Sequence, residues 1–179
     1  TPDEFYEKQT AGAVITTSQP SPGDVTAMWD ELLREYDEIL FIPMSSGLSN
    51  TCQTAALLAE EEPYTGRVFV VDNHRISVTQ AMSVLDAATL AAQGISGLGI
   101  KETLEKEALD ATIYIAVDTL EYLKKGGRIT PAAAALGTIL KLKPVLTIQG
   151  DKLDSYAKAR GMKSAFRTML DALSGDIAG

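Results

Sequence analysis

Two short, continuous apolar runs, residues 38–43 and 67–72, constrain the fold of this chain more than any other feature. Both are rich in β-branched and aromatic residues, as is typical of strands that are covered on both faces. Residues 50–61 lie between the runs and residues 77–93 follow them, and both stretches have apolar residues at helical spacing. This alternation predicts an α/β fold with a parallel, doubly wound sheet flanked by helices. Ligands of such sheets bind at the carboxyl ends of the strands.

Two helices are predicted before the first run. Thr1 and Ser21 each precede a proline and are followed three positions later by an acidic residue, which is the pattern of a capped helix start. One face of the second helix is apolar, with Val25, Met28, Trp29, Leu32, Leu33 and Tyr36.

The stretch after residue 93 completes the first predicted domain. Residues 94–99 are interpreted as a linker, residues 101–109 as a charged surface helix and residues 112–117 as a third buried strand. Residues 1–118 are therefore expected to form the parallel α/β domain.

The pattern changes after residue 118. A short helix ends at Gly126-Gly127, an almost wholly apolar helix is predicted over residues 132–141, and a final helix over residues 162–173. Two strand-like stretches, residues 144–149 and 153–159, flank Gly150-Asp151-Lys152, as in an antiparallel hairpin. Residues 119–179 are expected to be the start of a second α/β subdomain with antiparallel strands.

Charge and composition exclude several classes of function. The chain has 24 acidic and 16 basic residues and a net charge of −8, which argues against binding to the phosphates of nucleic acid and against anionic membrane surfaces. Its apolar runs are far shorter than the roughly 18 residues that a membrane span needs, so no transmembrane segment is expected. The single cysteine, Cys52, cannot form an internal disulfide, and we expect a cytoplasmic protein.

Two hydroxyl-rich loops are the first candidate site. Residues 16–21 follow the short apolar run 13–15, and residues 45–50 follow the run that ends at Pro43. Both loops are predicted to be strand-to-helix junctions of one parallel sheet, so that their hydroxyls and amides can converge on a small anion. The alternative is that Ser21 and Ser49 only cap helices.

A glycine-paired turn is the second candidate. Two glycines followed by Arg128 place a guanidinium on a tight turn, where it can bind a carboxylate or a phosphate through two hydrogen bonds. An ordinary surface turn is the alternative. The following helix, residues 131–141, has small side chains on all sides, which fits a buried core helix or the wall of a tunnel for an apolar ligand.

Other catalytic and cofactor signals are weak. The sequence has no phosphate-binding loop, no dinucleotide fingerprint and no metal-ligand spacing, so no cofactor and no metal are expected. A hydrolytic triad of Asp72, His74 and Ser77 would need an unusual geometry within one loop, and no nucleophile elbow is present. Cys52 is interpreted as a small core residue.

Taken together, three motifs resemble the DegV family of bacterial fatty-acid-binding proteins. Residues 17–22, Thr-Ser-Gln-Pro-Ser-Pro, resemble that family's Thr-Ser-Gln-Pro-Ser element. Residues 45–53 resemble its Ser-Ser-x-Leu-Ser-Gly-Thr-Tyr-Gln element, and residues 122–130 its Leu-x-x-Gly-Gly-Arg-Ile-Ser turn. The resemblance extends over essentially the whole chain, which is similar to the middle portion of a family member.

The resemblance implies a carrier and not an enzyme. Such a protein encloses a long-chain fatty acid in a tunnel and presents its carboxylate to a separate fatty-acid kinase, which forms the acyl phosphate. Carried over by motif, Thr17 and Ser49 bind the carboxylate, the amide of Asn50 assists, and Arg128 faces the head group or the phosphate. Asn50 stands where the family usually has glycine and Cys52 where it has tyrosine.

The resemblance also implies two absent elements. The family's first strand would precede Thr1, and its late segment with a histidine near the head group would follow Gly179. Two other functions stay open: a small-molecule serine hydrolase of the α/β type that uses Ser49 or the loop of residues 72–77, and an interaction domain without a ligand. A hydrolase would react with a fluorophosphonate, whereas a carrier would not.

Overall fold

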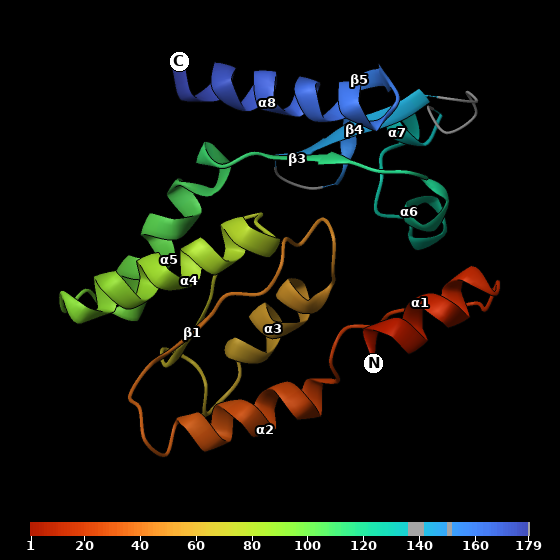
Figure 1. Cartoon of the computed structure of the whole chain (residues 1–179). Helices are drawn as coiled ribbons and strands as arrows, with labels where there is room; N and C mark the ends of the chain where they lie inside the picture. Colours follow the sequence, from red (N-terminus) through yellow and green to blue (C-terminus); the bar gives the residue numbers. More distant parts are fainter. Residues whose placement is uncertain (136–141, 150–151, 179) are drawn as a thin grey trace.

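The computed structural model describes residues 1–135, 142–149 and 152–178 and contains two separate sheets (Figure 1). Strands β1 (Ile39–Phe41) and β2 (Val68–Val70) form a parallel pair. Strands β3 (Ile113–Ala116), β4 (Leu142–Ile148) and β5 (Asp154–Arg160) form an antiparallel sheet in the order β3-β4-β5. The predicted fold class, a parallel α/β unit followed by a unit with antiparallel strands, is confirmed.

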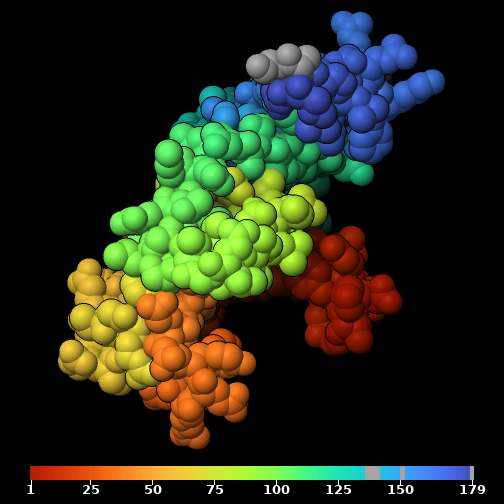
Figure 2. Space-filling view, turned by 90° about the vertical axis from the view of Figure 1, so that its left-hand side faces the viewer, coloured from red at the N-terminus to blue at the C-terminus, as the bar shows by residue number. Residues whose placement is uncertain are grey.

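Helices pack against both sheets, and the first two begin where the sequence places capping residues. The hydroxyl of Thr1 accepts the N–H of Glu4 and that of Ser21 accepts the N–H of Asp24. The helical elements are α1 (Pro2–Thr10), α2 (Pro22–Leu32), α3 (Thr51–Ala59), α4 (Ser77–Ala92), α5 (Gly97–Lys106), the 3-10 turn η1 (Ala108–Asp110), α6 (Glu121–Gly126), α7 (Pro131–Ala135) and α8 (Met162–Ala178). Helix α1 buries no side chain and projects from the body of the molecule (Figure 2).

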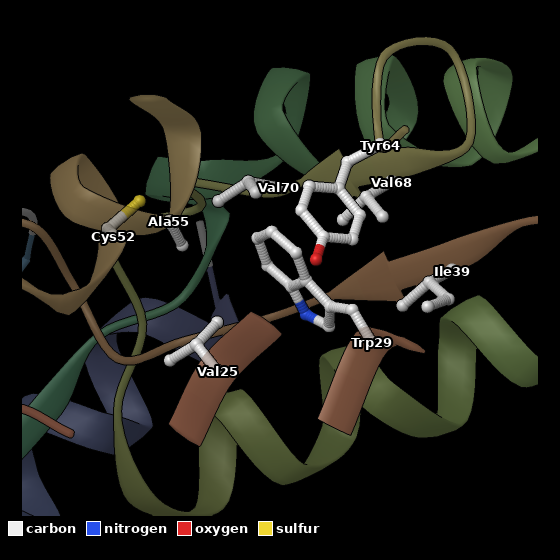
Figure 3. Packing of buried hydrophobic residues seen from close by; sticks show 8 residues of the cluster. All are labelled: Val25, Trp29, Ile39, Cys52, Ala55, Tyr64, Val68 and Val70. Atoms are coloured by element: carbon white, nitrogen blue, oxygen red, sulfur yellow. The ribbon is translucent and has the colours of Figure 1, made fainter. Parts of the chain in front are cut away.

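The core of the parallel half is built around Trp29, which is completely buried (Figure 3). Its ring meets those of Phe41 and Tyr64 edge to face, with centroids 5.6 and 5.2 Å apart. Aromatic rings prefer this geometry because their positive edges face negative ring faces. Residues from α2, α3, β1 and β2 complete the cluster, namely Val25, Ile39, Cys52, Ala55, Val68 and Val70. Met28, although it is next to Trp29, is 57% exposed.

The central strand of the antiparallel sheet, β4, buries apolar side chains on both faces. Val145 and Ala159 pack against Ala165 of α8 on one face. On the other face, Leu146 and Ile148 join a cluster with residues from the loops and helices, namely Leu48, Leu120, Ile129, Ala133 and Leu153. Leu48 belongs to the loop that follows β1, so this cluster joins the two halves of the chain.

The third predicted strand is correct in position and wrong in sheet membership. Residues 112–117 were predicted as part of the parallel domain, but β3 pairs antiparallel with β4, with Ile113 opposite Ile148 and Ala116 opposite Val145. An apolar run shows that a segment is buried and does not show which backbone it pairs with. The ladder of β4, which is seven residues long, supplies that partner.

Three smaller predictions differ in outcome. Residues 94–99 are not wholly a linker, because the Ser96 hydroxyl accepts the N–H of Gly99 and α5 begins at Gly97. The hairpin is confirmed, since β4 and β5 pair antiparallel, although the turn at 150–151 lies outside the described residues. The helix predicted over 132–141 is present as α7 up to Ala135, and residues 136–141 lie outside the described part.

Candidate functional site

Residues 45–49 form a compact turn after β1, which we call the serine turn. The N–H groups of Leu48 and Ser49 donate to the carbonyl of Ser45, and the N–H of Gly47 donates to the Ser45 hydroxyl. Two further bonds come from outside: Ser45 N–H donates to the Arg75 carbonyl at 2.9 Å and Ser46 N–H to Asp72 Oδ1 at 3.3 Å. Because these amides donate within the protein, the serine turn offers a ligand its side chains.

Ser49 ends the serine turn and lies two residues before the start of α3, whose N-cap position is Asn50. The Ser49 hydroxyl accepts the N–H of Thr51 at 3.2 Å and shares a hydrogen bond of 2.8 Å with the Thr51 hydroxyl. The side chain is half-buried. The N-cap position of α3 belongs to Asn50 and not to Ser49, so the capping alternative is confirmed for Ser21 only, and the contact of Ser49 with a ligand stays a prediction. Another hydroxyl is not a base, so these two bonds do not activate Ser49 as a nucleophile.

The loop of residues 16–21 also reaches α3, although it does not follow a strand. Residues 13–15 were predicted as a strand-like run, but they form no strand and Val14 is 94% exposed. A run of three apolar residues buries too little surface to hold a strand without a partner. The amide of Gln19 instead hydrogen-bonds the hydroxyl of Thr54 on α3 at 3.0 Å. Thr17, two residues earlier, is exposed to solvent.

The glycine-paired turn brings Arg128 onto the serine turn. Gly127 has a φ of 68°, the left-handed conformation that ends α6. Arg128 follows, and its Nε donates to the Leu48 carbonyl at 3.3 Å while an Nη donates to the Gly126 carbonyl. The Arg128 guanidinium thus contacts the backbone of the residue before Ser49, although Arg128 and Ser49 are far apart in the sequence. An Arg has five N–H donors, so this arrangement leaves donors for a carboxylate.

The predicted site residues consequently surround the N-terminus of α3. Asn50 is the exposed residue before the helix, and its carbonyl accepts the N–H of Thr54, the residue that binds Gln19. The structure therefore brings Ser49, Asn50 and Arg128 together and places the loop of Thr17 on the first turn of the same helix. A helix N-terminus carries partial positive charge, which favours a carboxylate.

An open cavity of about 720 Å³ lies beside the serine turn. This volume is in the range of small-molecule sites. Its lining comes from the serine turn, α3 and the antiparallel sheet with its flanking turns, namely Ser46, Gly47, Gln53, Thr130, Thr147, Gln149, Lys152 and Asp154. The hydroxyl of Thr130 donates to Asp154, and the pKa of that carboxyl is lowered by this bond and by the Ser155 N–H. The apolar cluster with Leu48 and Ile129 is built from neighbouring residues of the same turns.

The loop of residues 72–77 supports the serine turn and does not form the geometry of a triad. His74 Nδ1 lies 3.8 Å from Asp72 Oδ1, beyond hydrogen-bond distance, and this same oxygen accepts Ser46 N–H. Ser77 begins α4 with a φ of 58°. The role of Asp72 as an acceptor is not among the predictions from the sequence. The only signal was its position directly after a strand, at the edge where ligands bind.

Cys52 lies in the first turn of α3 and is buried, as predicted. Burial raises the pKa of its thiol to about 11, and the nearby negative charge of Asp72 adds to this effect. A thiol with this pKa stays protonated at neutral pH and is a poor nucleophile. Cys52 is therefore a core residue of the site's scaffold.

Within residues 1–135, 142–149 and 152–178, no group of three or more His, Cys, Asp or Glu side chains is placed to hold a metal ion. In the same part of the chain, no helix is both long and apolar enough to span a membrane.

These features define a two-sheet α/β protein whose candidate ligand site lies where loops of the parallel half meet the antiparallel sheet. The DegV family model matches residues 1–179, and the chain belongs to that family. The predicted resemblance is thereby confirmed.

Relatives and solved structures agree with this assignment. A DegV domain-containing protein of Deinococcus radiodurans is 38% identical over 159 residues, which are 89% of this chain and 56% of the relative. A DegV family protein from Thermus thermophilus, described as fatty-acid-binding, has a TM-score of 0.88 at 41% identity and matches 100% of this chain and 64% of its own. DegV of Bacillus subtilis, also described as a fatty-acid-binding protein, has a TM-score of 0.80 at 30% identity over 97% of this chain and 62% of its own. The chain thus spans less than two thirds of the length of these relatives.

Proposed function

We propose that this chain binds the carboxylate of a long-chain fatty acid at the N-terminus of α3, with Thr17 and Ser49 as hydrogen-bond donors, the amide of Asn50 assisting and Arg128 facing the head group. The observation that carries the proposal is the approach of Arg128 to the serine turn, where its Nε meets the carbonyl of Leu48, the residue before Ser49. Three sequence motifs, separated by up to about a hundred residues, meet around one helix start. The solved relatives described as fatty-acid-binding support the choice of ligand.

The acyl tail would supply most of the affinity. Burial of about fifteen methylenes contributes roughly 12 kcal/mol at about 0.8 kcal/mol each, before the cost of association. The few hydrogen bonds to the carboxylate contribute less and fix the position of the head group. The open cavity and the apolar cluster that contains Leu48 and Ile129 lie beside the head-group residues, and the tail is expected to enter between them.

The second part of the proposal concerns the phosphorylation of the bound fatty acid. The bound carboxylate is presented to a separate kinase, which transfers the phosphoryl group, while Arg128 faces the phosphate that is added. The chain itself would then act as a carrier without a cofactor and with the fatty acid as its ligand. Among the described residues, Ser49 and Asp72 both make hydrogen bonds that suit scaffold roles, which favours a carrier over a serine hydrolase.

The test is a comparison of oleic acid with its methyl ester on the delipidated full chain. Native mass spectrometry and a fluorescence titration should show one bound oleate, with at least tenfold weaker binding of the ester, because the ester lacks the charge that Arg128 and the start of α3 attract. Ser49→Ala should reduce this preference.

Ser96→Ala is the matched control. Ser96 is the N-cap residue of α5, where its hydroxyl accepts the N–H of Gly99, and it precedes Gly97, whose N–H donates to Glu38 at the opposite edge of the parallel sheet. A folded chain that binds neither compound, or binds both equally, would contradict the proposal. Labelling of a serine by a fluorophosphonate would favour the hydrolase instead.

A further inference from the structure

The serine turn is held from the side by the loop that follows β2. Strands β1 and β2 are parallel neighbours, so their carboxyl ends lie side by side, and the two loops meet there. Ser45 N–H donates to the Arg75 carbonyl, and Ser46 N–H donates to the Asp72 carboxylate. The second bond is the contact in which a side chain of one loop fixes the backbone of the other.

Fixing Ser46 also fixes Ser49. The two residues belong to one hydrogen-bonded turn, in which the Ser45 carbonyl accepts from both Leu48 and Ser49. A rotation of the Ser46 peptide would therefore move the Ser49 backbone and the start of α3. The position of the Ser49 hydroxyl thus depends on an acceptor that lies more than twenty residues away in the sequence.

The backbone of Asp72 is itself held by α5. Its N–H donates to Glu105 Oε1 of α5 at 3.0 Å, and the same oxygen accepts from Lys101, which also donates to the Val70 carbonyl. On the other side, the Asp72 carboxylate acts on the buried Cys52 thiol of α3, whose pKa its negative charge helps to raise. A residue whose backbone is bonded to a neighbouring helix can position an adjacent loop.

We propose that Asp72 is a positioning residue for the carboxylate site, which holds the serine turn so that Ser49 and the start of α3 are oriented toward the ligand. This inference rests on the proposed function, because it assigns Asp72 to the same site. Asp72 does not touch the ligand. Its negative charge would repel a fatty-acid carboxylate, so its contribution must come from the geometry of its oxygen as an acceptor.

An isosteric variant separates geometry from charge. Asp72→Asn keeps a side-chain oxygen in place of Oδ1 and removes the charge, whereas Asp72→Ala removes the acceptor. Asp72→Ser serves as a second truncation if the alanine variant does not fold. The matched control is Glu38→Ala, since Glu38 Oε2 accepts the N–H of Gly97 at 2.7 Å, a carboxylate-to-amide bond at the opposite edge of the parallel sheet.

Binding is measured with oleic acid and its methyl ester on each full-length variant. Asp72→Ala should raise the Kd for oleic acid about fivefold and leave the Kd for the ester within twofold, because only the acid uses the oriented head-group site. Asp72→Asn and Glu38→Ala should bind both compounds within twofold of the parent chain. An equal loss for acid and ester, or no recovery in Asp72→Asn, would overturn the proposal.

Hydrogen exchange gives a readout that does not need a ligand. The amides of Leu48 and Ser49 should exchange at least tenfold faster in Asp72→Ala than in the parent chain, and at an unchanged rate in Glu38→Ala. Unchanged exchange in Asp72→Ala would overturn the positioning role. If the parent chain does not distinguish acid from ester, the proposed function fails. If it does so and Asp72→Ala retains the full preference, the positioning role alone fails.

Discussion

The parallel and antiparallel halves of the molecule use apolar residues in different ways. The parallel half has strands of only three residues, and its stability depends on helices that enclose the ring of Trp29. The antiparallel half has two seven-residue strands, of which the central strand β4 buries apolar side chains on both faces. Short parallel strands end in loops that carry polar groups, whereas the longer sheet offers apolar surface. A ligand with a charged head and an apolar tail fits the junction of the two.

The largest effect is expected from breaking the core of the parallel half. Trp29→Ala removes a completely buried ring and its two edge-to-face contacts, which should lower the free energy of unfolding by about 3–5 kcal/mol. Urea denaturation followed by far-UV circular dichroism measures this change. Met28→Ala, at an exposed neighbour, should stay within about 0.5 kcal/mol of the parent chain. If Trp29→Ala lowered the free energy of unfolding by less than about 1 kcal/mol, the stability of the parallel half would not depend on this core.

The next effect tests the connection between the halves. Leu48 is anchored in the serine turn and is 7% exposed within the cluster of the antiparallel half. Leu48→Ala should cost about 2–4 kcal/mol and should separate two unfolding transitions, one seen by Trp29 fluorescence and one by hydrogen exchange in β4. Leu57→Ala, at a residue that is 67% exposed, is the control. Coincident and unshifted transitions would mean that another contact couples the halves.

A pH-dependent loss of stability is expected from the parallel half. The pKa of the Cys52 thiol is about 11 in the folded chain, against 9.0 as its ordinary value. Below pH 9 both states keep the proton and the stabilisation is complete. Between pH 9 and 11 the unfolded chain loses the proton more readily, so the stability should fall by about 2 kcal/mol.

Cys52→Ala should reduce this loss, and urea denaturation at pH 8, 9, 10 and 11 measures it. Tyr64→Phe is a useful companion, because burial and the hydrogen bond to Asp30 also raise the pKa of the Tyr64 hydroxyl. Parallel stability profiles for the parent chain and Cys52→Ala would refute the assignment to Cys52.

The smallest free-energy effect concerns the junction itself. Thr17→Ala combined with Ser49→Ala should raise the Kd for oleic acid about tenfold, or about 1.4 kcal/mol, because the tail retains most of the affinity and water can replace a hydroxyl partner. Phosphorylation of the bound fatty acid by a fatty-acid kinase should nevertheless be lost, since the carboxylate is no longer held in register. Phosphorylation at the parent rate would refute the assignment of these two residues.

Local features of the fold were predictable where a few neighbouring residues decide them. Thr1 and Ser21 cap their helices as expected, because a cap needs only a hydroxyl and an N–H two or three positions away. The hairpin of β4 and β5 followed from two strand-like stretches around a short turn. The left-handed Gly127 followed in the same way from paired glycines after a helix.

Other features depended on partners that are distant in the sequence. The burial pattern of residues 112–117 could not show that β3 pairs with β4. Met28 has the spacing of a core residue and is exposed, because the apolar face predicted for α2 is wider than the surface that packs against it. Among the candidate site residues, motifs pointed to Thr17, Ser49, Asn50 and Arg128, whereas the only local signal for Asp72 was its position directly after a strand.

The sequence by itself determined the alternation of helices and strands, the capped helix starts, and the motifs that place the chain in the DegV family, because each of these depends on residues within about one turn of one another. Only the tertiary structure decided how the motifs are arranged. It brought Arg128 to the Leu48 carbonyl, Asp72 to the Ser46 amide and Gln19 to Thr54. The physical reason is that these contacts follow from the packing of two sheets and a few helices into shared cores, and packing is a property of the whole chain.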